Sequence, residues 1–234
     1  QQRRVMAGQQ DERTALLLGA DGVEKLQRSR VAIFGVRGVG GYCAEALPRA
    51  AVGELFLVDK DVVDESNINR QIVALHSTVG LPKAEVMRAR IADINPDCRV
   101  TARVCFYDAE TAAGFDFSAF DYVADAVDDV AAKTDIIARA VEAHIPAISA
   151  MGAGNKLFPE KFEVADISKT QVCPLARSVR RRLRERGVER GVKAVFSREV
   201  PAFSGDAVGS VPFVPSVMGL IMAGEIIKDL VQKK

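Results

Sequence analysis

Short apolar runs alternate with longer helix-forming stretches along the first two thirds of the chain. Runs of strand length lie at 31–35, 55–59, 99–104, 122–126 and 147–150. Helices are predicted at 14–28, 38–51, 83–95 and 130–143. The first two strands are apolar almost throughout, as expected of strands buried on both faces. This alternation predicts an α/β fold, a Rossmann-like and mostly parallel sheet with helices on both faces.

The alternation weakens after Gly154. An edge strand is predicted at 162–166, a strongly basic helix at 174–186, and a mobile loop rich in Gly, Ser and Pro at 201–209. The C-terminal stretch 211–231 is apolar but contains two prolines and three charged residues. Its uninterrupted apolar part is shorter than the roughly 20 residues that cross a bilayer. We therefore expect a buried or interface helix that begins near Ser216, and no membrane partner.

No linker or internal repeat divides the chain. The prediction is one domain over 1–234, with a nucleotide-binding core at 12–154 and an extension at 155–234 that faces substrate or a partner subunit. Residues 1–12 are polar, with no apolar signal region, so a soluble cytoplasmic protein is expected. The four cysteines form no CxxC pair, which argues against a disulfide framework and a tetrahedral zinc site.

A glycine-rich turn, Gly35–Gly41, joins the first predicted strand to the first helix of the core. Such a turn lets backbone N–H groups and a helix N-terminus face a phosphate, and Asp59 ends the next strand where an acidic residue can bind a ribose hydroxyl. A turn that serves only close packing is the alternative. Arg37 occupies the second glycine position of the usual G-x-G-x-x-G fingerprint, where it crowds the phosphates, turns outward or pairs with them.

The segment D-K-D-V-V-D-E-S-N-I-N-R-Q, 59–71, carries the more specific signal, with Lys83 following it. Hydride transfer has no need of Asn67, Arg70 and Lys83 behind the ribose carboxylate. Attack of a carboxylate on a phosphorus needs such residues. Positioned cations and a metal stabilise the negative charge that develops on the phosphoryl group and the leaving phosphates. The metal ligand expected is Asp128 in D-A-V-D-D. The alternatives are solvated charge for the cations and a helix N-cap for Asp128.

These residues resemble the adenylation site of the superfamily of ubiquitin-activating-like enzymes. The resemblance implies that Asp59 holds the ribose, that Asn67, Arg70 and Lys83 hold the phosphates of ATP, and that Asp128 holds Mg²⁺. The remaining residues assigned to the nucleotide by the same motifs are Gly35, Gly38, Gly40, Asp61 and Gln71. Arg13, six residues before Gly19, matches the arginine that a partner subunit inserts into the neighbouring site, which implies a homodimer.

The second half, with S-A-M-G-A-G-N-K at 149–156 and A-D-I-S-K-T-Q-V-C-P-L-A-R at 165–177, resembles the tRNA threonylcarbamoyladenosine dehydratase branch. The resemblance implies ATP-dependent activation of the threonyl carboxylate on a tRNA nucleoside, followed by ring closure with loss of water. No enzyme nucleophile is required, so Cys173 is expected to be a bystander. A sulfur-transfer partner protein is a further expectation.

The basic helix supports an RNA partner, although the net charge of the whole chain is only +1. Such a patch neutralises backbone phosphates and gives salt-sensitive binding, while a solvated surface helix is the alternative. The candidate RNA-binding residues are Arg177, Arg180, Arg181 and Arg184.

Three other functions remain open at this point. One is activation of the C-terminus of a ubiquitin-like sulfur carrier, which uses the same ATP site. Another is an NAD-dependent oxidoreductase, supported only by Asp59 and the glycines. The last is a nucleotide-binding protein that has lost catalysis, for which Arg37, Pro48 and Ala51 are the arguments.

Overall fold

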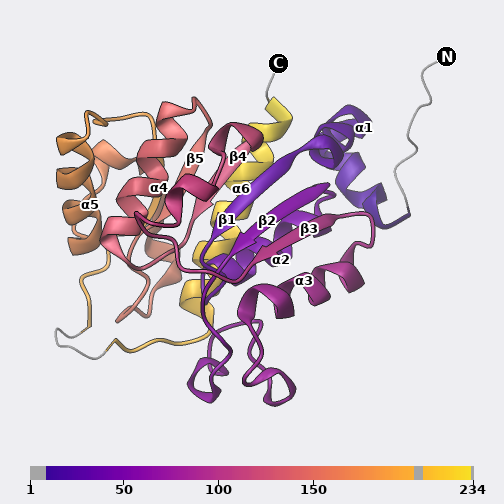
Figure 1. Cartoon of the computed structure of the whole chain (residues 1–234), viewed down its shortest axis with the longest axis horizontal. Helices are drawn as coiled ribbons and strands as arrows, with labels where there is room; N and C mark the ends of the chain where they lie inside the picture. Colours follow the sequence, from indigo (N-terminus) through magenta and orange to yellow (C-terminus); the bar gives the residue numbers. More distant parts are fainter. Residues whose placement is uncertain (1–8, 203–207, 233–234) are drawn as a thin grey trace.

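Seven strands form one sheet that is parallel except at one edge (Figure 1). The computed structural model describes residues 9–202 and 208–232. The strands are β1 (Arg30–Phe34), β2 (Glu54–Val58), β3 (Arg99–Arg103), β4 (Tyr122–Asp125), β5 (Ala147–Ala150), β6 (Phe162–Asp166) and β7 (Lys193–Ser197). They lie in the order β3-β2-β1-β4-β5-β7-β6, and only β6 runs antiparallel, to β7. The α/β fold with a mostly parallel sheet is confirmed.

Helices cover both faces of the sheet, because successive strand residues point to opposite faces. The α-helices are α1 (Glu12–Arg28), α2 (Gly40–Arg49), α3 (Lys83–Ile94), α4 (Val130–Glu142), α5 (Pro174–Glu185) and α6 (Phe213–Gln232). In β1, Val31 and Ile33 join a core with α2, α3 and α6, whereas Ala32 and Phe34 join a second core with α4 and α5. Strands buried in this way on both faces explain the continuous apolar runs.

The predicted elements are present with ends displaced by a few residues. Helix α1 contains a break at Gly19, whose φ is 76°. The C-terminal helix begins at Phe213 rather than near Ser216, since Pro215 is tolerated in a first helical turn. Of the predicted loop at 201–209, residues 203–207 lie outside the described residues.

Strand β7 was not predicted, although it pairs directly with β5 and separates β6 from the rest of the sheet. The second half of the chain therefore extends the same sheet as the first.

Helix α6 crosses the sheet and reaches the start of α2 (Figure 1). Gly219 allows the two helices to approach closely, because a Cβ added there would lie 2.2 Å from the carbonyl oxygen of Val39. Further along, a Cβ on Gly38 would lie 3.3 Å from Cβ of Pro215. Helix α6 thus packs against the glycine-rich turn.

No helix within the described ranges is sufficiently long and apolar to span a bilayer.

Candidate active site

The carboxyl ends of β1, β2 and β4 meet where the strand order reverses, which is where open α/β sheets bind ligands. The turn after β1 is tight: Gly35 has φ 88°, and its N–H donates to the Val58 carbonyl at 2.8 Å. A Cβ on Gly35 would lie 2.7 Å from the Ala126 oxygen, and one on Gly40 only 1.8 Å from the Gly35 oxygen. These two glycines are therefore required by the shape of the turn itself.

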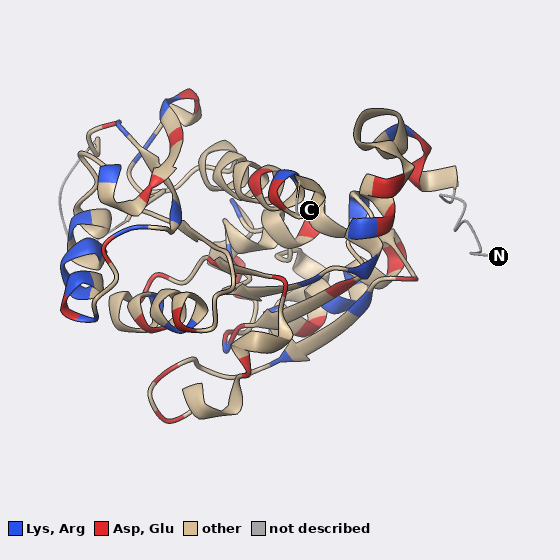
Figure 2. Ribbon diagram, turned by 90° about the horizontal axis from the view of Figure 1, so that it is seen from above, with Lys and Arg blue, Asp and Glu red and all other residues tan. Residues whose placement is uncertain are grey.

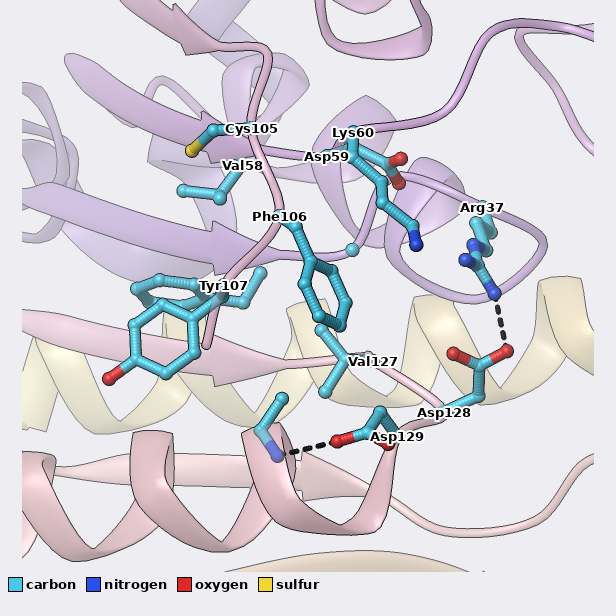
Figure 3. Close-up of a pocket in the computed structure, with 13 residues that line it drawn as sticks. Arg37, Val58, Asp59, Lys60, Cys105, Phe106, Tyr107, Val127, Asp128 and Asp129 are labelled. Atoms are coloured by element: carbon cyan, nitrogen blue, oxygen red, sulfur yellow. Dashed lines mark hydrogen bonds and ion pairs between the residues drawn. The ribbon is translucent and has the colours of Figure 1, made fainter. Parts of the chain in front are cut away.

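The first hollow, of about 410 Å³, opens at these strand ends (Figure 3). Val58, Phe106 and Val127 give it apolar walls, and Asp59 and Lys60 lie at its polar end. Figure 3 shows the Phe106 ring directed toward Val127. The Lys60 ammonium lies 4.2 Å from the centroid of that ring. The hollow therefore combines a flat apolar surface with a carboxylate, as a nucleoside requires.

Asp59 is held in place by the backbone around it. Its Oδ2 accepts the N–H of Val36 at 2.6 Å, and its Oδ1 accepts the N–H of Asp61 at 2.8 Å. Burial raises the pKa of Asp59, while these two donors act in the opposite direction. Each carboxylate oxygen has a second acceptor position, so a ribose hydroxyl can still be bound.

Arg37 joins two carboxylates at the rim of this hollow. Its Nε lies 2.9 Å from Oδ2 of Asp61, and its Nη1 donates to Oδ2 of Asp128 (Figure 3). Lys83 is buried and places its Nζ 3.2 Å from the same Asp61 oxygen. Burial opposes ionisation of Asp61, but Arg37 and Lys83 outweigh it and lower the pKa of this carboxyl. Burial likewise opposes the charge of Arg37, yet Asp128 and Asp61 raise its pKa.

A second and more open hollow, of about 1050 Å³, continues from the first. Arg70 and Gln71 line it together with Gly38, the glycine-containing segment 152–154 and Pro215 of α6. Nη1 of Arg70 donates to the Ser66 carbonyl at 2.8 Å and to Oδ1 of Asn69 at 2.7 Å, which fixes the side chain at the wall.

Gln71 is the least satisfied polar residue of this wall. It is 5 % exposed, and its Oε1 has no hydrogen-bond partner among the described residues. An unpaired buried amide oxygen is costly unless a ligand or water satisfies it. The wall of the second hollow therefore presents a polar atom that a ligand or water can satisfy.

Of two predicted residues, Asn67 takes part in local structure and Asp128 does not. The Asn67 side chain accepts the N–H of Asp64 at 3.1 Å and closes the turn that begins there. The N-cap of α4 is Asp129, which accepts the N–H of Ala132 at 2.8 Å, and not Asp128. Asp128 remains 75 % exposed and faces the hollows, so the capping alternative does not apply to it.

A buried ion pair supports the Asp128 loop from below. Nζ of Lys133 lies 2.7 Å from Oδ2 of Asp125 and donates to the Ala150 carbonyl at 2.9 Å. Ser149 donates to the same Asp125 oxygen at 2.5 Å, and Oδ1 of Asp125 accepts the N–H of Val127 at 3.2 Å. The network joins β4, β5 and α4 directly under the junction of the two hollows.

Arg13 lines neither hollow of its own chain. It is exposed on α1, and no residue of α1 lines either hollow. The neighbouring Leu16 and Leu17 are 86 % and 87 % exposed, an apolar surface that the described residues leave uncovered.

The candidate RNA-binding arginines lie on α5, where basic residues gather at one end of the molecule (Figure 2). Arg177, Arg181 and Arg184 are exposed and have no ion-pair or hydrogen-bond partner among the described residues. Arg180 differs, because its Nη1 donates to the Thr170 carbonyl at 2.9 Å and to the Thr170 hydroxyl. Arg180 therefore anchors α5 to the preceding segment.

Sequence reasoning missed Phe106, Lys60 and Val127. Phe106 lies three residues after the end of β3, near the carboxyl end of a parallel strand as Asp59 does after β2, and this signal could have found it. Cys173, in contrast, is buried with its sulfur 3.7 Å from where a Cβ on Gly152 would lie, which agrees with a packing role.

No group of three or more His, Cys, Asp or Glu side chains suited to a metal occurs within 9–202 and 208–232.

Comparison with known proteins defines the class. Residues 11–234 match the ThiF family, so the chain is a ThiF-family protein. The Bacillus subtilis tRNA threonylcarbamoyladenosine dehydratase is 45 % identical over 241 residues, 95 % of each chain. The Escherichia coli protein of that name is 40 % identical over 193 residues, 80 % of this chain and 72 % of that one. The chain belongs to the tRNA threonylcarbamoyladenosine dehydratase family, and the resemblance found in its sequence is confirmed.

Solved structures agree. The crystal structure of the Escherichia coli dehydratase in complex with AMP superposes with a TM-score of 0.89 at 35 % identity, covering 95 % of this chain and 94 % of that chain. Its complex with ATP gives the same TM-score at 36 % identity. The Escherichia coli molybdopterin-synthase adenylyltransferase is 38 % identical over 130 residues, but these are 55 % of this chain and 51 % of that one.

Proposed function

We propose that this protein is an ATP-dependent tRNA threonylcarbamoyladenosine dehydratase. The observation that carries the proposal is the pair of joined hollows: one with an apolar wall and Asp59, the other with Arg70 and Gln71, meeting at Asp128. In a chain of this family, the first accommodates the nucleoside of ATP and the second the activated carboxylate of the modified nucleoside.

The phosphates of ATP cross from the first hollow to the second in this arrangement. Asp59 binds the ribose, and the turn around Gly38 presents backbone N–H groups to the phosphates. Arg70 supplies positive charge from the wall of the second hollow, and the buried Lys83, which lines neither hollow, supplies it through Asp61. Asn67 acts on the phosphates through the turn that it closes, since its amide oxygen is already used there.

Asp128 and Asp61 fit a Mg²⁺ ion, which prefers oxygen ligands and is held by one or two carboxylates together with phosphates and water. Asp128 is the more accessible of the two, at 75 % against 27 % exposed. When bound there, the ion would neutralise phosphate charge. Arg37 forms an ion pair with each of the two carboxylates.

The reaction converts a poor leaving group into a good one. An oxygen of the threonyl carboxylate attacks a phosphorus of ATP and displaces pyrophosphate (attack at the α-phosphorus) or ADP (attack at the γ-phosphorus). An atom of the carbamoyl group then attacks the activated carbonyl carbon, and the carbamoyl group releases a proton to solvent. The ring closes, and the carboxylate oxygen departs on AMP or on phosphate, so the nucleoside loses one water in total. Arg70 and Lys83 stabilise the charge on the phosphoryl oxygens as it develops.

The tRNA binds across α5 in this proposal. Arg177, Arg181 and Arg184 face solvent there, beside the second hollow to which α5 contributes Leu175. Electrostatic contact with RNA phosphates predicts binding that weakens steeply with salt. The competing possibility, a solvated helix, predicts tRNA affinity unaltered when these arginines are changed to glutamine.

A homodimer completes the site. Arg13 reaches the neighbouring subunit's phosphates, and exposed Leu16 and Leu17 beside it form part of the contact. A sulfur-transfer partner and the cytoplasmic location both stay predictions.

The deciding experiment incubates the purified protein with Mg²⁺, ATP and tRNA that carries threonylcarbamoyladenosine, and then weighs the digested nucleosides. We expect an ATP-dependent loss of one water, abolished in Arg70→Ala and retained in Arg88→Ala, an exposed arginine of α3 that lines neither hollow. Mixed Arg13→Ala and Arg70→Ala subunits should regain part of the activity, because half of the mixed dimers' sites are intact. An unchanged nucleoside, with a working control enzyme, would instead favour activation of a sulfur carrier or a site that has lost catalysis.

A further inference from the structure

Arg37 occupies a position where the fingerprint calls for glycine, and the local backbone accommodates it. The non-glycine residues with positive φ in the described ranges are Ala51, His144, Asn155 and Val172, so Arg37 is not among them. Its side chain is therefore carried without backbone strain. A glycine at this position is needed only to leave room for phosphates, and Arg37 fills that room with a cation.

The place of the guanidinium is specific. Among the described residues, only Arg37, Val127 and Asp128 line both hollows. A polyphosphate that runs from the first hollow to the second must therefore pass beside Arg37.

The surroundings of Arg37 are acidic. Asp59, Asp61 and Asp128 all act on it, and Lys83 balances only part of that charge through Asp61. Arg37 uses Nε for Asp61 and Nη1 for Asp128. A guanidinium has five N–H donors in a planar fork that matches phosphate oxygens, so donors remain for a further anion.

We propose that Arg37 is a phosphate-binding residue that Asp128 holds in place until ATP binds. The triphosphate takes the Nη1 donor from Asp128, and the released carboxylate becomes available to the cation that accompanies ATP. This inference rests on the proposed use of ATP at this site. It assigns to Arg37 the opposite role from a side chain that blocks a degenerate site.

The test is calorimetric binding of ATP, ADP and adenosine to the full-length protein, without tRNA, in EDTA and in Mg²⁺. Four proteins are compared: wild type, Arg37→Gln, Asp128→Asn, and the double variant, which keeps the net charge of the site. Arg88→Gln is the matched control, because this arginine also pairs with a carboxylate but lies on α3.

We expect Arg37→Gln to lose about tenfold or more in affinity for ATP, as for removal of a charge-assisted hydrogen bond, less for ADP, and nothing for adenosine. In EDTA, Asp128→Asn should bind ATP more tightly than wild type, because Arg37 is released. The double variant should remain weaker than wild type.

Three results would overturn the proposal. Tighter ATP binding by Arg37→Gln would show that Arg37 blocks the phosphates, and a double variant equal to wild type would show that Arg37 only neutralises Asp128. A wild-type protein that binds adenosine but not ATP would contradict it as well. Failure of wild type to bind any of the three ligands would instead remove the proposed function, and this inference with it.

Discussion

Single charged side chains close to the junction of the hollows form ion pairs with more than one residue. The Asp61 carboxylate forms ion pairs with both Arg37 and Lys83, so a substitution of either cation changes the electrostatic environment of the other. The sequence motif predicted one site for Asp59, Arg70 and Lys83; Asp59 lines the first hollow, Arg70 the second, and Lys83 lies behind them, paired with Asp61. The motif could not show that Arg37 pairs with Asp128, since nothing in the spacing of 91 positions indicates that contact.

Val172 is a residue in an unfavourable backbone conformation. Its φ is 63°, a region that β-branched side chains adopt at a cost of about 1–2 kcal/mol. The side chain is 44 % exposed, so little burial is lost on substitution. We expect Val172→Asn to raise the free energy of unfolding by about 1 kcal/mol, because asparagine tolerates this region. Denaturant unfolding followed by circular dichroism measures it.

Val200→Asn is the matched control for this prediction. Val200 is 73 % exposed and has no positive φ. It should change stability by no more than about 0.5 kcal/mol. Equal gains at the two positions would contradict the conformational explanation.

Most elements of the first half followed from the pattern, because β1 and β2 are separate apolar runs and β1, β2 and β4 each precede a helix. Strand β7 did not, since its five residues directly follow a charged stretch and, although α5 precedes it, it does not continue the parallel strand-helix alternation of the first half. Its antiparallel pairing with β6 depends on contacts across the sheet. The second hollow was missed for a related reason, because its walls come from segments that only the folded chain brings together.

Helix α6 contains two glycines that differ in their surroundings. A Cβ on Gly219 would meet the Val39 oxygen, at the start of α2, whereas one on Gly224 would meet nothing within 4 Å. Gly219→Ala should cost about 1–3 kcal/mol through overpacking and should weaken ATP binding, because α2 begins in the phosphate-facing turn. Thermal unfolding and ATP titration measure both effects.

Gly224→Ala tests the same helix without that contact. It should raise stability by up to about 1 kcal/mol, because alanine is the better helix former, and leave ATP binding unchanged. A loss of ATP affinity in both variants would mean that α6 acts through its general stability and not through Gly219.

At the scale of the whole molecule, the Asp125–Lys133 pair fixes α4 to β4 and β5 on one side of the switch point. Lys133 is fully buried, and its removal leaves an uncompensated carboxylate. Lys133→Met should therefore cost about 3–5 kcal/mol of unfolding free energy. Asp125→Asn/Lys133→Met should recover part of this loss. The exposed Lys228 provides the control, since Lys228→Met should be nearly neutral. A Lys133→Met protein as stable as the control would refute a structural role for the pair.

The route of the chain through the two cores has a consequence for its synthesis. Met218, Met222, Ile226 and Leu230 of α6 fill a core with strands made much earlier, and Gly219 packs against the turn that follows β1. A ribosome-bound chain that has released the glycine-rich turn but not yet α6 therefore exposes an unfilled apolar surface. Such a nascent chain cannot complete its nucleotide site until α6 emerges, and its uncovered apolar surface is prone to aggregation until then.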